Sequence, residues 1–302
     1  MSKKITRKVL LAVFALVLSV VALGTTTYAW FTLGATVQVE SFEMNVKGGE
    51  GLEVAYVKKS DSTDYRYVSK LTSENIINYL QTDYGYSNWA SDFEMDAVTS
   101  ADGKTFQKLN EDHKLEETSI DAKTYVEFKL KFRTKAADQK LVWNQVSLNS
   151  NGVDWAPGVP FIGIGGSEVG TSTTDKYYAK NGTRVSVEGE GATAPVVYEL
   201  PAESGANAVL SNNAPNWTQG AHDFYKEVLG HDLSTTIGTA TAAQTITDVT
   251  NVDIVEFGAE TNGYHYAEVT VRIYLEGLDS ETFNAILTDK IQVALGFTIA
   301  NI

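Results

Sequence analysis

The four histidines are the residues in this 302-residue sequence with the most obvious capacity for catalysis or metal binding: His113, His222, His231 and His265. A zinc peptidase usually carries a helical His-Glu-x-x-His, whose two histidines bind the metal while the glutamate acts as the base. No two histidines here have that spacing. His222-Asp223 and His231-Asp232 repeat at nine residues, which is not a ligand spacing on one helix or strand. They could meet across a loop, but solvated or locally hydrogen-bonded histidines are the favoured interpretation.

Other patterns that carry chemistry are also weak. The absence of cysteine excludes disulfides, thiolate metal sites and cysteine nucleophiles. Gly163-Ile-Gly-Gly-Ser167 lacks the strand–turn–helix context of a dinucleotide loop and predicts a plain turn. Acidic residues crowd the early loops without the ligand spacing of a calcium site, which favours solvated loops; they are Asp61, Asp64, Asp92, Glu94, Asp96 and Asp102. We therefore expect no catalytic residue, metal or cofactor, and a protein that is not an enzyme.

The charge of the chain limits its partners. It carries 24 Lys+Arg against 38 Asp+Glu, for a net charge of −14. Four of the positive charges lie in the first eight residues, so a chain without them has a net charge of about −18 (−14 − 4). Such an acidic protein repels nucleic acid and anionic membranes, and the charge favours solubility outside the cell.

The N-terminus has the layout of a secretory signal peptide. A basic head, residues 1–8, precedes an apolar run over residues 9–23, and Thr27-Tyr28-Ala29 supplies small residues three and one positions before a cut. Thr27, Ala29 and Trp30 therefore mark the predicted cleavage site, and cleavage leaves Trp30 or Phe31 as the new N-terminus. The alternative is a retained anchor of about 20 residues, continuing through Tyr28, Trp30 and Phe31 as an interfacial aromatic belt.

This junction resembles a known family. The basic head, the short apolar core and Gly24–Thr32 (GTTTYAWFT) are similar to exported Gram-positive proteins of the TasA/camelysin kind. Precursors of that family typically carry G-T-Y-A-W/A-F-T before a first strand, and a SipW-type signal peptidase processes them. Residues 97–106 and 270–297 also resemble surface proteins of this group. The resemblance implies either a fibre-forming biofilm-matrix subunit with a jelly-roll β-sandwich or a protein labelled as a metallopeptidase, and the histidine spacing does not support the second.

The stretch after the cleavage site predicts a strand with a bulge. Over residues 31–46 the apolar phase runs through Ala35, Val37 and Val39, and then switches to Phe42, Met44 and Val46. A β-bulge produces such a one-residue slip. After cleavage of the signal peptide, residues 31–46 form an N-terminal arm. Its backbone N–H and C=O groups need the edge of a sheet as their hydrogen-bond partner. In a monomer it joins its own sandwich; in a fibre it adds to the sheet of a neighbouring subunit, with Val37, Val39, Phe42 and Met44 as subunit contacts.

Alternating apolar residues predict strands along most of the remaining chain, over residues 52–57, 125–133, 141–148, 176–188, 194–200, 265–275 and 291–299. We expect residues 141–148 to be the hairpin partner of 125–133, and Asn181-Gly182 to form a type I′ turn inside 176–188. Short helices are predicted after Thr72 or Ser73, at residues 223–229 and, capped by Asp279, through Leu287.

Four aromatic side chains fall on the outward phase of their strands: Trp143, Tyr264, Tyr266 and Tyr274. They are either an exposed stripe for glycans or a neighbouring subunit, or they are covered by the polar segment 82–118.

The sequence as a whole predicts an all-β fold, a jelly-roll-like antiparallel β-sandwich with short helical insertions, preceded by an N-terminal signal helix. We expect a signal peptide at residues 1–29 and one domain at 30–302, with an insertion around 72–118 and loops at 201–250. The expected function is a secreted, non-catalytic subunit of an extracellular fibre or biofilm matrix. Its partners are the signal peptidase and copies of itself, with no nucleic acid and with the membrane only as precursor. The alternatives are a monomeric adhesin or glycan-binding protein, and a camelysin-like secreted metallopeptidase.

Overall fold

The computed structural model describes residues 38–46, 51–60, 65–110, 112–119, 124–201, 210–211 and 213–302. The predicted signal peptide and cleavage site (Thr27, Ala29, Trp30) and Val37 lie outside these ranges. In the described residues strands predominate, in several sheets whose pairings are mostly antiparallel, which confirms the all-β class.

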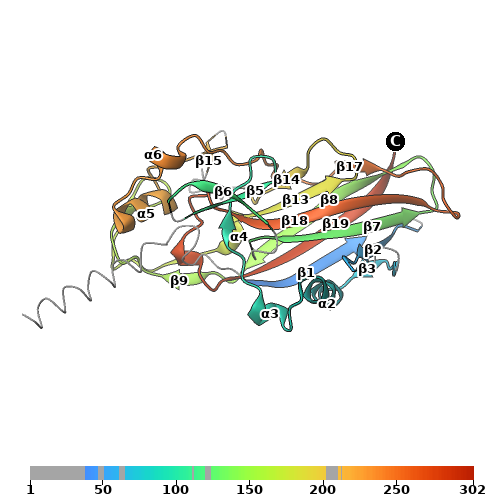
Figure 1. Ribbon diagram of the computed structural model, residues 1–302, viewed down its shortest axis with the longest axis horizontal. Coiled ribbons are helices and arrows are strands. Elements are labelled where there is room, and N and C mark those ends of the chain that lie inside the picture. The colour runs from blue at the N-terminus through green and yellow to red at the C-terminus, as the bar shows by residue number, and fades with distance from the viewer. Residues whose placement is uncertain are drawn as a thin grey trace, which may run out of the picture.

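Two sheets make up the body of the molecule (Figure 1). The five-stranded sheet has the order β17-β8-β19-β1-β3, with β17 Val252–Glu256, β8 Gln139–Ser150, β19 Lys290–Asn301, β1 Gln38–Val46 and β3 Lys70–Leu71. The six-stranded sheet has the order β14-β13-β18-β7-β2, with β14 Val196–Tyr198, β13 Thr183–Gly189, β18 His265–Glu276, β7 Val126–Thr134 and β2 Glu53–Val57. Its sixth strand, β4 (Ala97–Val98), pairs with the end of β18.

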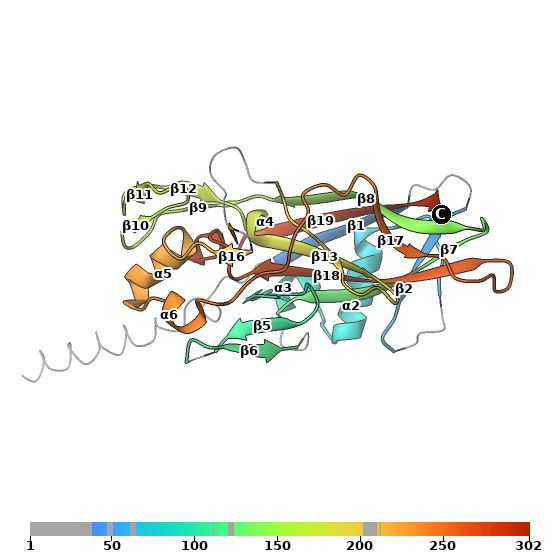
Figure 2. The ribbon, with the colours of Figure 1, turned by 90° about the horizontal axis from the view of Figure 1, so that it is seen from above.

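Short hairpins and helices surround the two sheets (Figure 2). The hairpins pair β5 (Phe106–Leu109) with β6 (Leu115–Thr118), β9 (Val153–Trp155) with β12 (Asp175–Tyr177), β10 (Phe161–Ile162) with β11 (Glu168–Val169), and β15 (Leu210–Ser211) with β16 (Ala214–Pro215). The helices are α2 (Ser73–Tyr84), α3 (Trp89–Asp92), α4 (Ala179–Gly182), α5 (Ala221–Leu229), α6 (Ser234–Ile237) and the 3-10 turn η2 (Asn284–Ile286). The predicted helix at 223–229 is confirmed by α5, and the predicted plain turn at 163–167 joins β10 to β11.

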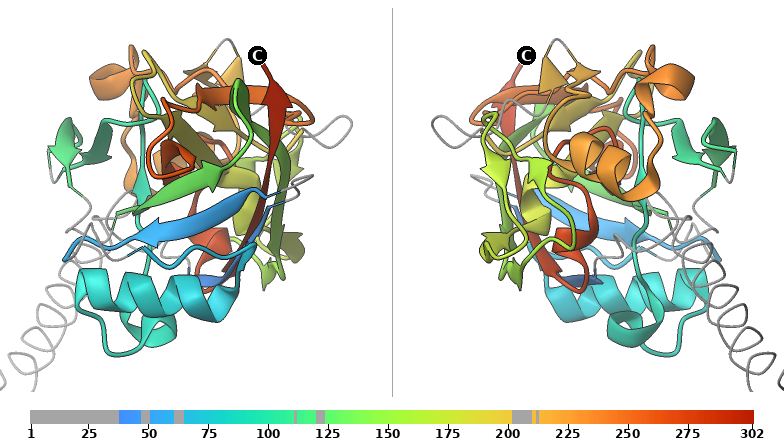
Figure 3. Two further views of the ribbon diagram at one scale, coloured as in Figure 1. Left: turned by 90° about the vertical axis from the view of Figure 1, so that its right-hand side faces the viewer. Right: turned by 90° about the vertical axis from the view of Figure 1, so that its left-hand side faces the viewer.

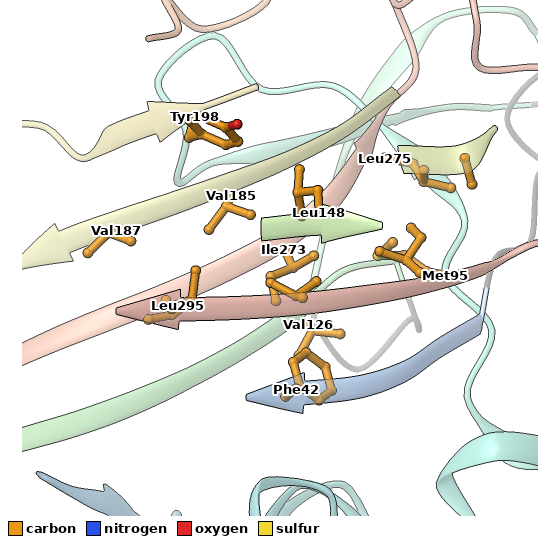
Figure 4. Close-up of a cluster of buried hydrophobic side chains, with 14 of the residues drawn as sticks. Phe42, Met95, Val126, Leu148, Val185, Val187, Tyr198, Ile273, Leu275 and Leu295 are labelled. Carbon is orange, nitrogen blue, oxygen red and sulfur yellow. The ribbon is translucent and has the colours of Figure 1, made fainter. Parts of the chain in front are cut away.

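Apolar side chains from both sheets form a common core (Figure 4). In β7 the buried positions alternate with partly or fully exposed ones, as expected for a strand with one wet face. Phe132 of β7 lies 5.2 Å, centroid to centroid, from Phe297 of β19 in the other sheet. Trp143 of β8 similarly faces Tyr198 of β14 at 6.1 Å. The two sheets therefore pack face to face.

The predicted hairpin between residues 125–133 and 141–148 is wrong. β7 pairs with β18 and β2, whereas β8 pairs with β17 and β19 in the other sheet. The charges opposite one another on β7 and β18 are complementary, since Lys131 faces Glu268, and Arg272 donates to Glu127 at 2.7 Å. Cross-strand pairs of this kind stabilise one partner over another. Alternation fixes which face of a strand is buried, but not which strand lies beside it.

Two turn predictions near the ends of strands are also wrong. Asn181-Gly182 closes the short helix α4 rather than a type I′ hairpin, and a Cβ on Gly182 would lie 2.2 Å from Thr282 Oγ1. The glycine is thus needed for close packing. Asp279 does not begin a helix of two turns, because only η2 follows it. Its carboxylate accepts instead from the Glu281 N–H at 2.8 Å and from Arg184 at 2.7 Å.

Candidate assembly site

The predicted N-terminal strand lies inside the five-stranded sheet of its own chain. β1 runs parallel to β19, in register from Gln38 opposite Lys290 to Val46 opposite Phe297. Among the described residues, its other edge pairs only with the two-residue strand β3, antiparallel, through Met44 and Asn45. In Figure 1 it lies beside β19, between that strand and the helices α2 and α3. We call the position between β19, β3 and α2 the β1 slot.

The predicted bulge in this strand is confirmed. The β1–β19 register shifts between Val39 and Ser41, so that Glu40 has no partner on β19. This is the one-residue slip that the switch in apolar phase along the sequence predicted. Immediately after the bulge, the Phe42 N–H donates to Ser73 Oγ at 3.2 Å. A side chain from α2 thus bonds a backbone group of β1, in addition to the strand-to-strand hydrogen bonds.

Phe42 is the aromatic anchor of β1 and is only 2% exposed. Its ring packs edge-on against Trp89 of α3 at 6.2 Å and against Phe128 of β7 at 6.0 Å, centroid to centroid. Trp89 in turn stacks on Phe93 at 4.3 Å. Phe42 therefore joins β1 to both the opposite sheet and the helical cover. Burying such a side chain contributes roughly 1.5–3 kcal/mol.

The helical cover of the slot follows from local sequence. Thr72 begins α2 as its N-cap, with its hydroxyl accepting from the Asn75 N–H while the Asn75 side chain accepts from the Thr72 N–H. This reciprocal pair is a capping box. Ile76 and Leu80, one turn apart, are the buried residues of the helix, which packs on β1 (Figure 3). Gly85 ends the helix at φ +73°, a left-handed conformation that suits glycine.

The predicted subunit contacts differ in how far the structure describes them. Phe42 is buried in its own chain. For Val39 and Met44 the backbone is described, and it lies opposite the buried residues Ile291 and Leu295. Within one chain the backbone at these positions therefore pairs with the chain's own β19, which is the monomer arrangement, and a contact between subunits stays a prediction. Sequence reasoning missed Ser73 and Trp89, because neither carries a signal that identifies its partner.

The histidines lie apart from one another, except for one pair. His231 stacks on His113, with ring centroids 4.9 Å apart, rather than meeting His222. His222 is buried, its Nε2 lies 3.0 Å from the Leu278 carbonyl oxygen, and burial lowers its pKa to about 4. His265 Nδ1 lies 2.9 Å from the Gly258 carbonyl oxygen. In the described part of the chain, no three His, Asp or Glu side chains are grouped so that they could hold a metal ion.

Two of the acidic loop residues, Asp92 and Asp102, accept hydrogen bonds within their own turns, and burial raises the pKa of a third, Asp96, to about 6. The Asp102 carboxylate accepts from the N–H groups of Lys104 and Thr105 at 2.8 and 2.7 Å, and Asp92 accepts from Ser87 and Asn88 at 3.0 and 2.8 Å. Asp61 and Asp64 lie outside the described residues.

A charge cluster lies where β18 ends, with Arg184, Glu276 and Asp279 buried, and no pattern in the sequence indicates it. Arg184 Nη2 lies 2.7 Å from Asp279 and 2.6 Å from Glu199. Glu276, also within the electrostatic reach of Arg184, is 0% exposed, and its Oε2 has no hydrogen-bond partner among the described residues. One guanidinium cannot neutralise three carboxylates, and burial raises the pKa of Glu276 to about 7. This cluster ties β13 to the end of β18, and its member Glu199 is partly exposed, with 28% of its side chain accessible.

The outward aromatic side chains divide into buried and surface pairs. Trp143 is buried because an extra residue at Asn144 shifts the β8–β19 register and turns Trp143 into the core, so its predicted outward position is wrong. Tyr274 is also buried, covered by Phe106 at 4.9 Å, which supports covering by the 82–118 segment at that position.

Tyr264 and Tyr266 are half-buried and belong to a surface ladder of rings and cations. The Arg133 guanidinium lies 4.0 Å from the ring centroid of Tyr67 and 4.3 Å from that of Tyr264. Lys131 lies 5.6 Å from the Tyr266 ring. Contacts of this kind are cation–π interactions, and they link the rings to the cations of β7.

None of the helices in the described part of the chain is long and apolar enough to cross a membrane. Comparison with known proteins finds no matching family model, no matching curated protein and no matching solved structure.

Proposed function

We propose that this protein is a secreted, non-catalytic structural protein, the subunit of an extracellular fibre or biofilm matrix, and that its subunits join by donating the N-terminal strand to a neighbour. The proposal includes cleavage of residues 1–29 by a signal peptidase, a TasA/camelysin-like identity, and the jelly-roll form of the sandwich with its signal helix in the precursor. The signal layout and the Gly24–Thr32 resemblance support export.

The observation that carries the proposal is the position of β1. The strand is held by a parallel ladder to β19, one aromatic anchor and one bond from Ser73, and in the described part of the chain its far edge pairs only with the two residues of β3. These are the components of strand addition, in which backbone bonds give affinity and a side-chain pocket gives specificity. The same strand of a second subunit can make the same contacts, because subunits of one protein have identical slots.

The connection after β1 is short and rich in glycine. Six residues, 47–52, separate β1 from β2, and Gly48, Gly49 and Gly51 are among them. Fully extended, six residues span at most about 20–22 Å. Exchange of an identical element between subunits is a known route to oligomers, and short hinge segments favour it. An exchanged strand makes the same interactions as a strand in its own slot, so concentration and geometry decide between the monomer and the fibre.

The test is deletion of residues 30–46 followed by complementation. We expect the truncated protein to be folded but less stable and unable to polymerise, as judged by negative-stain microscopy. A synthetic peptide of residues 30–46 should restore the lost stability by filling the vacated slot. The matched control is the same peptide with Phe42→Ala, which keeps the backbone but lacks the anchor. Polymerisation of the truncated protein, or its complete unfolding at all concentrations, would refute assembly through this arm.

A monomeric glycan-binding surface protein is the second candidate, and the ring–cation ladder on β7 and β18 favours it. Tyr67 and Tyr264 flank Arg133, so flat apolar rings and a cation lie side by side on a partly exposed surface. Affinity electrophoresis in gels containing defined polysaccharides tests this function. Retardation of the wild-type protein that Tyr264→Ala abolishes, with no fibres under the microscope, would favour it over the fibre subunit.

A further inference from the structure

A cleft of about 230 Å³ opens at the end of the molecule that carries the β9–β12 and β10–β11 hairpins. Its walls are aromatic and include Phe161, Tyr177 and Phe283. The volume lies below the roughly 300–1,000 Å³ of typical small-molecule sites, so the cleft suits one large side chain.

The aromatic wall is built rather than accidental. Phe283 and Phe161 are buried, with ring centroids 5.8 Å apart, and Phe283 meets Tyr177 edge-on at 5.4 Å. Trp155 supports both Phe161 and Phe283 from behind, at 6.4 and 5.4 Å. Ring networks of this kind hold their members in place, and the half-buried Tyr177 leaves part of its ring accessible to an incoming ring.

The polar lining of the cleft favours a cation. Two carboxylates lie there, Asp175 and Glu281, and the Asn181 side-chain amide orients Glu281 by donating to it at 2.7 Å. Lys176 also lines the cleft, and its ammonium lies 3.9 Å from Asp154 on β9. Burial, with a smaller contribution from the nearby Asp175 carboxylate, raises the pKa of Tyr177 to about 12.

The cleft lies within reach of the chain that precedes β1. Gln38, the first residue of β1, is opposite Lys290. The residue before Lys290, Asp289, accepts from the Ala179 N–H at 2.9 Å, and Ala179 follows Tyr178, which lines the cleft. The eight residues 30–37 span up to about 26–29 Å when extended. An arm that leaves Gln38 therefore has ample length to reach the cleft at this end of the sheet.

We propose that this cleft is the receptor for the processed amino terminus: the aromatic ring of Trp30 or Phe31 enters the Phe161–Phe283 wall, and the new α-ammonium lies against Asp175 and Glu281. The inference rests on the proposed cleavage after Ala29, because only cleavage places an ammonium next to an aromatic residue here. The arm reaches the cleft from the first residue of β1. The terminus therefore docks on the subunit whose slot holds that β1 strand.

This arrangement couples processing to assembly. In the precursor, the backbone of Trp30 continues into Ala29, and an uncharged amide occupies the place of the ammonium. The precursor therefore lacks the ionic half of the interaction, and its strand is held less firmly in a slot than the strand of the processed chain. The cleft in this way distinguishes processed from unprocessed subunits.

The test measures the titration of the α-amino group in full-length mature protein that begins at Trp30, released from a fusion partner without extra residues and labelled by reductive ¹³C-methylation for NMR. We expect the α-ammonium to hold its proton about tenfold more tightly than in the D175N/E281Q double variant. Glu168→Gln is the matched control, because Glu168 is exposed on the neighbouring strand β11 and does not line the cleft. It should leave the titration unchanged.

A second protein keeps the test independent of the variants' folding. It begins at Tyr28, two residues earlier, and its terminal amine should titrate as in a free peptide. Equal titration in all of these proteins would overturn the inference. Cleavage itself is tested separately, by the intact mass of the exported protein. A mass that shows an uncleaved precursor would overturn the proposed function rather than the docking of the terminus.

Discussion

Replacing Phe42 with alanine tests whether β1 occupies its slot in solution. The side chain is 2% exposed and touches Trp89 and Phe128. Truncating a buried phenylalanine to alanine costs about 3–5 kcal/mol, since it adds a cavity to the lost transfer free energy. The two edge-to-face contacts account for about 0.5–1.5 kcal/mol each. Urea unfolding of the mature protein should therefore show a loss of about 3–5 kcal/mol.

The control for this measurement is Phe106→Ala. Phe106 is equally buried but packs on Tyr125 and Tyr274, in the smaller hydrophobic cluster away from β1. Both variants should lose global stability, but only Phe42→Ala should speed amide hydrogen exchange selectively in β1. A loss below about 1 kcal/mol for Phe42→Ala, less than a core site allows, would refute the packing described for this strand.

Three further substitutions test other parts of the account. Ser73→Ala removes the acceptor of the Phe42 N–H and should cost about 1–3 kcal/mol in urea unfolding, whereas an unchanged midpoint would mean that water replaces the hydroxyl. Glu276→Gln should flatten the pH dependence of stability. Burial raises the pKa of Glu276 from 4.5 to about 7, so the folded state retains a proton that the unfolded chain releases. This contribution is complete below about pH 4.5 and is lost as the pH rises through 7, by up to about 1.4 kcal/mol per pH unit, and an equal slope in both proteins would contradict it. Ala29→Phe should block cleavage and retain the protein at the membrane, and an exported wild-type protein whose intact mass begins before Thr25 would contradict the signal-peptide assignment.

The sequence predicted local features of the fold better than it predicted neighbours. The phase switch between Val39 and Phe42 predicted the bulge of β1, and Thr72 or Ser73 was the predicted cap of α2, where the structure has Thr72. Both depend on residues a few positions apart. The parallel partner of β1 could not be predicted, because β19 lies at the other end of the sequence. The alternation of apolar residues indicates which face of a strand is buried, but not which strand pairs with it.

The mistaken predictions have the same origin. The outward position predicted for Trp143 fails because the extra residue at Asn144 is invisible in the pattern of β8 alone. Asn181-Gly182 suits a tight hairpin turn, but Thr282, a hundred residues later, requires the glycine for close packing. The helical cover of Phe42 was likewise beyond reach, since Trp89 carries no sign of facing β1. The sequence pattern of β1 identifies candidate site residues on the strand itself. It does not identify the residues of α2 and α3 that contact them.

The measurement that tests strand donation most directly is disulfide trapping between β1 and β19. The chain has no cysteine, so an introduced pair reports without background. Ser41 lies opposite the exposed residue Gln292 in the register of the two strands, within the range of separations that a disulfide allows. The S41C/Q292C protein should form covalent ladders between subunits when it is oxidised under fibre-forming conditions, while the K129C/T270C protein, with its pair across β7 and β18, should link only within one chain. Linkage of positions 41 and 292 exclusively within one chain, in samples that contain fibres, would contradict assembly by strand donation.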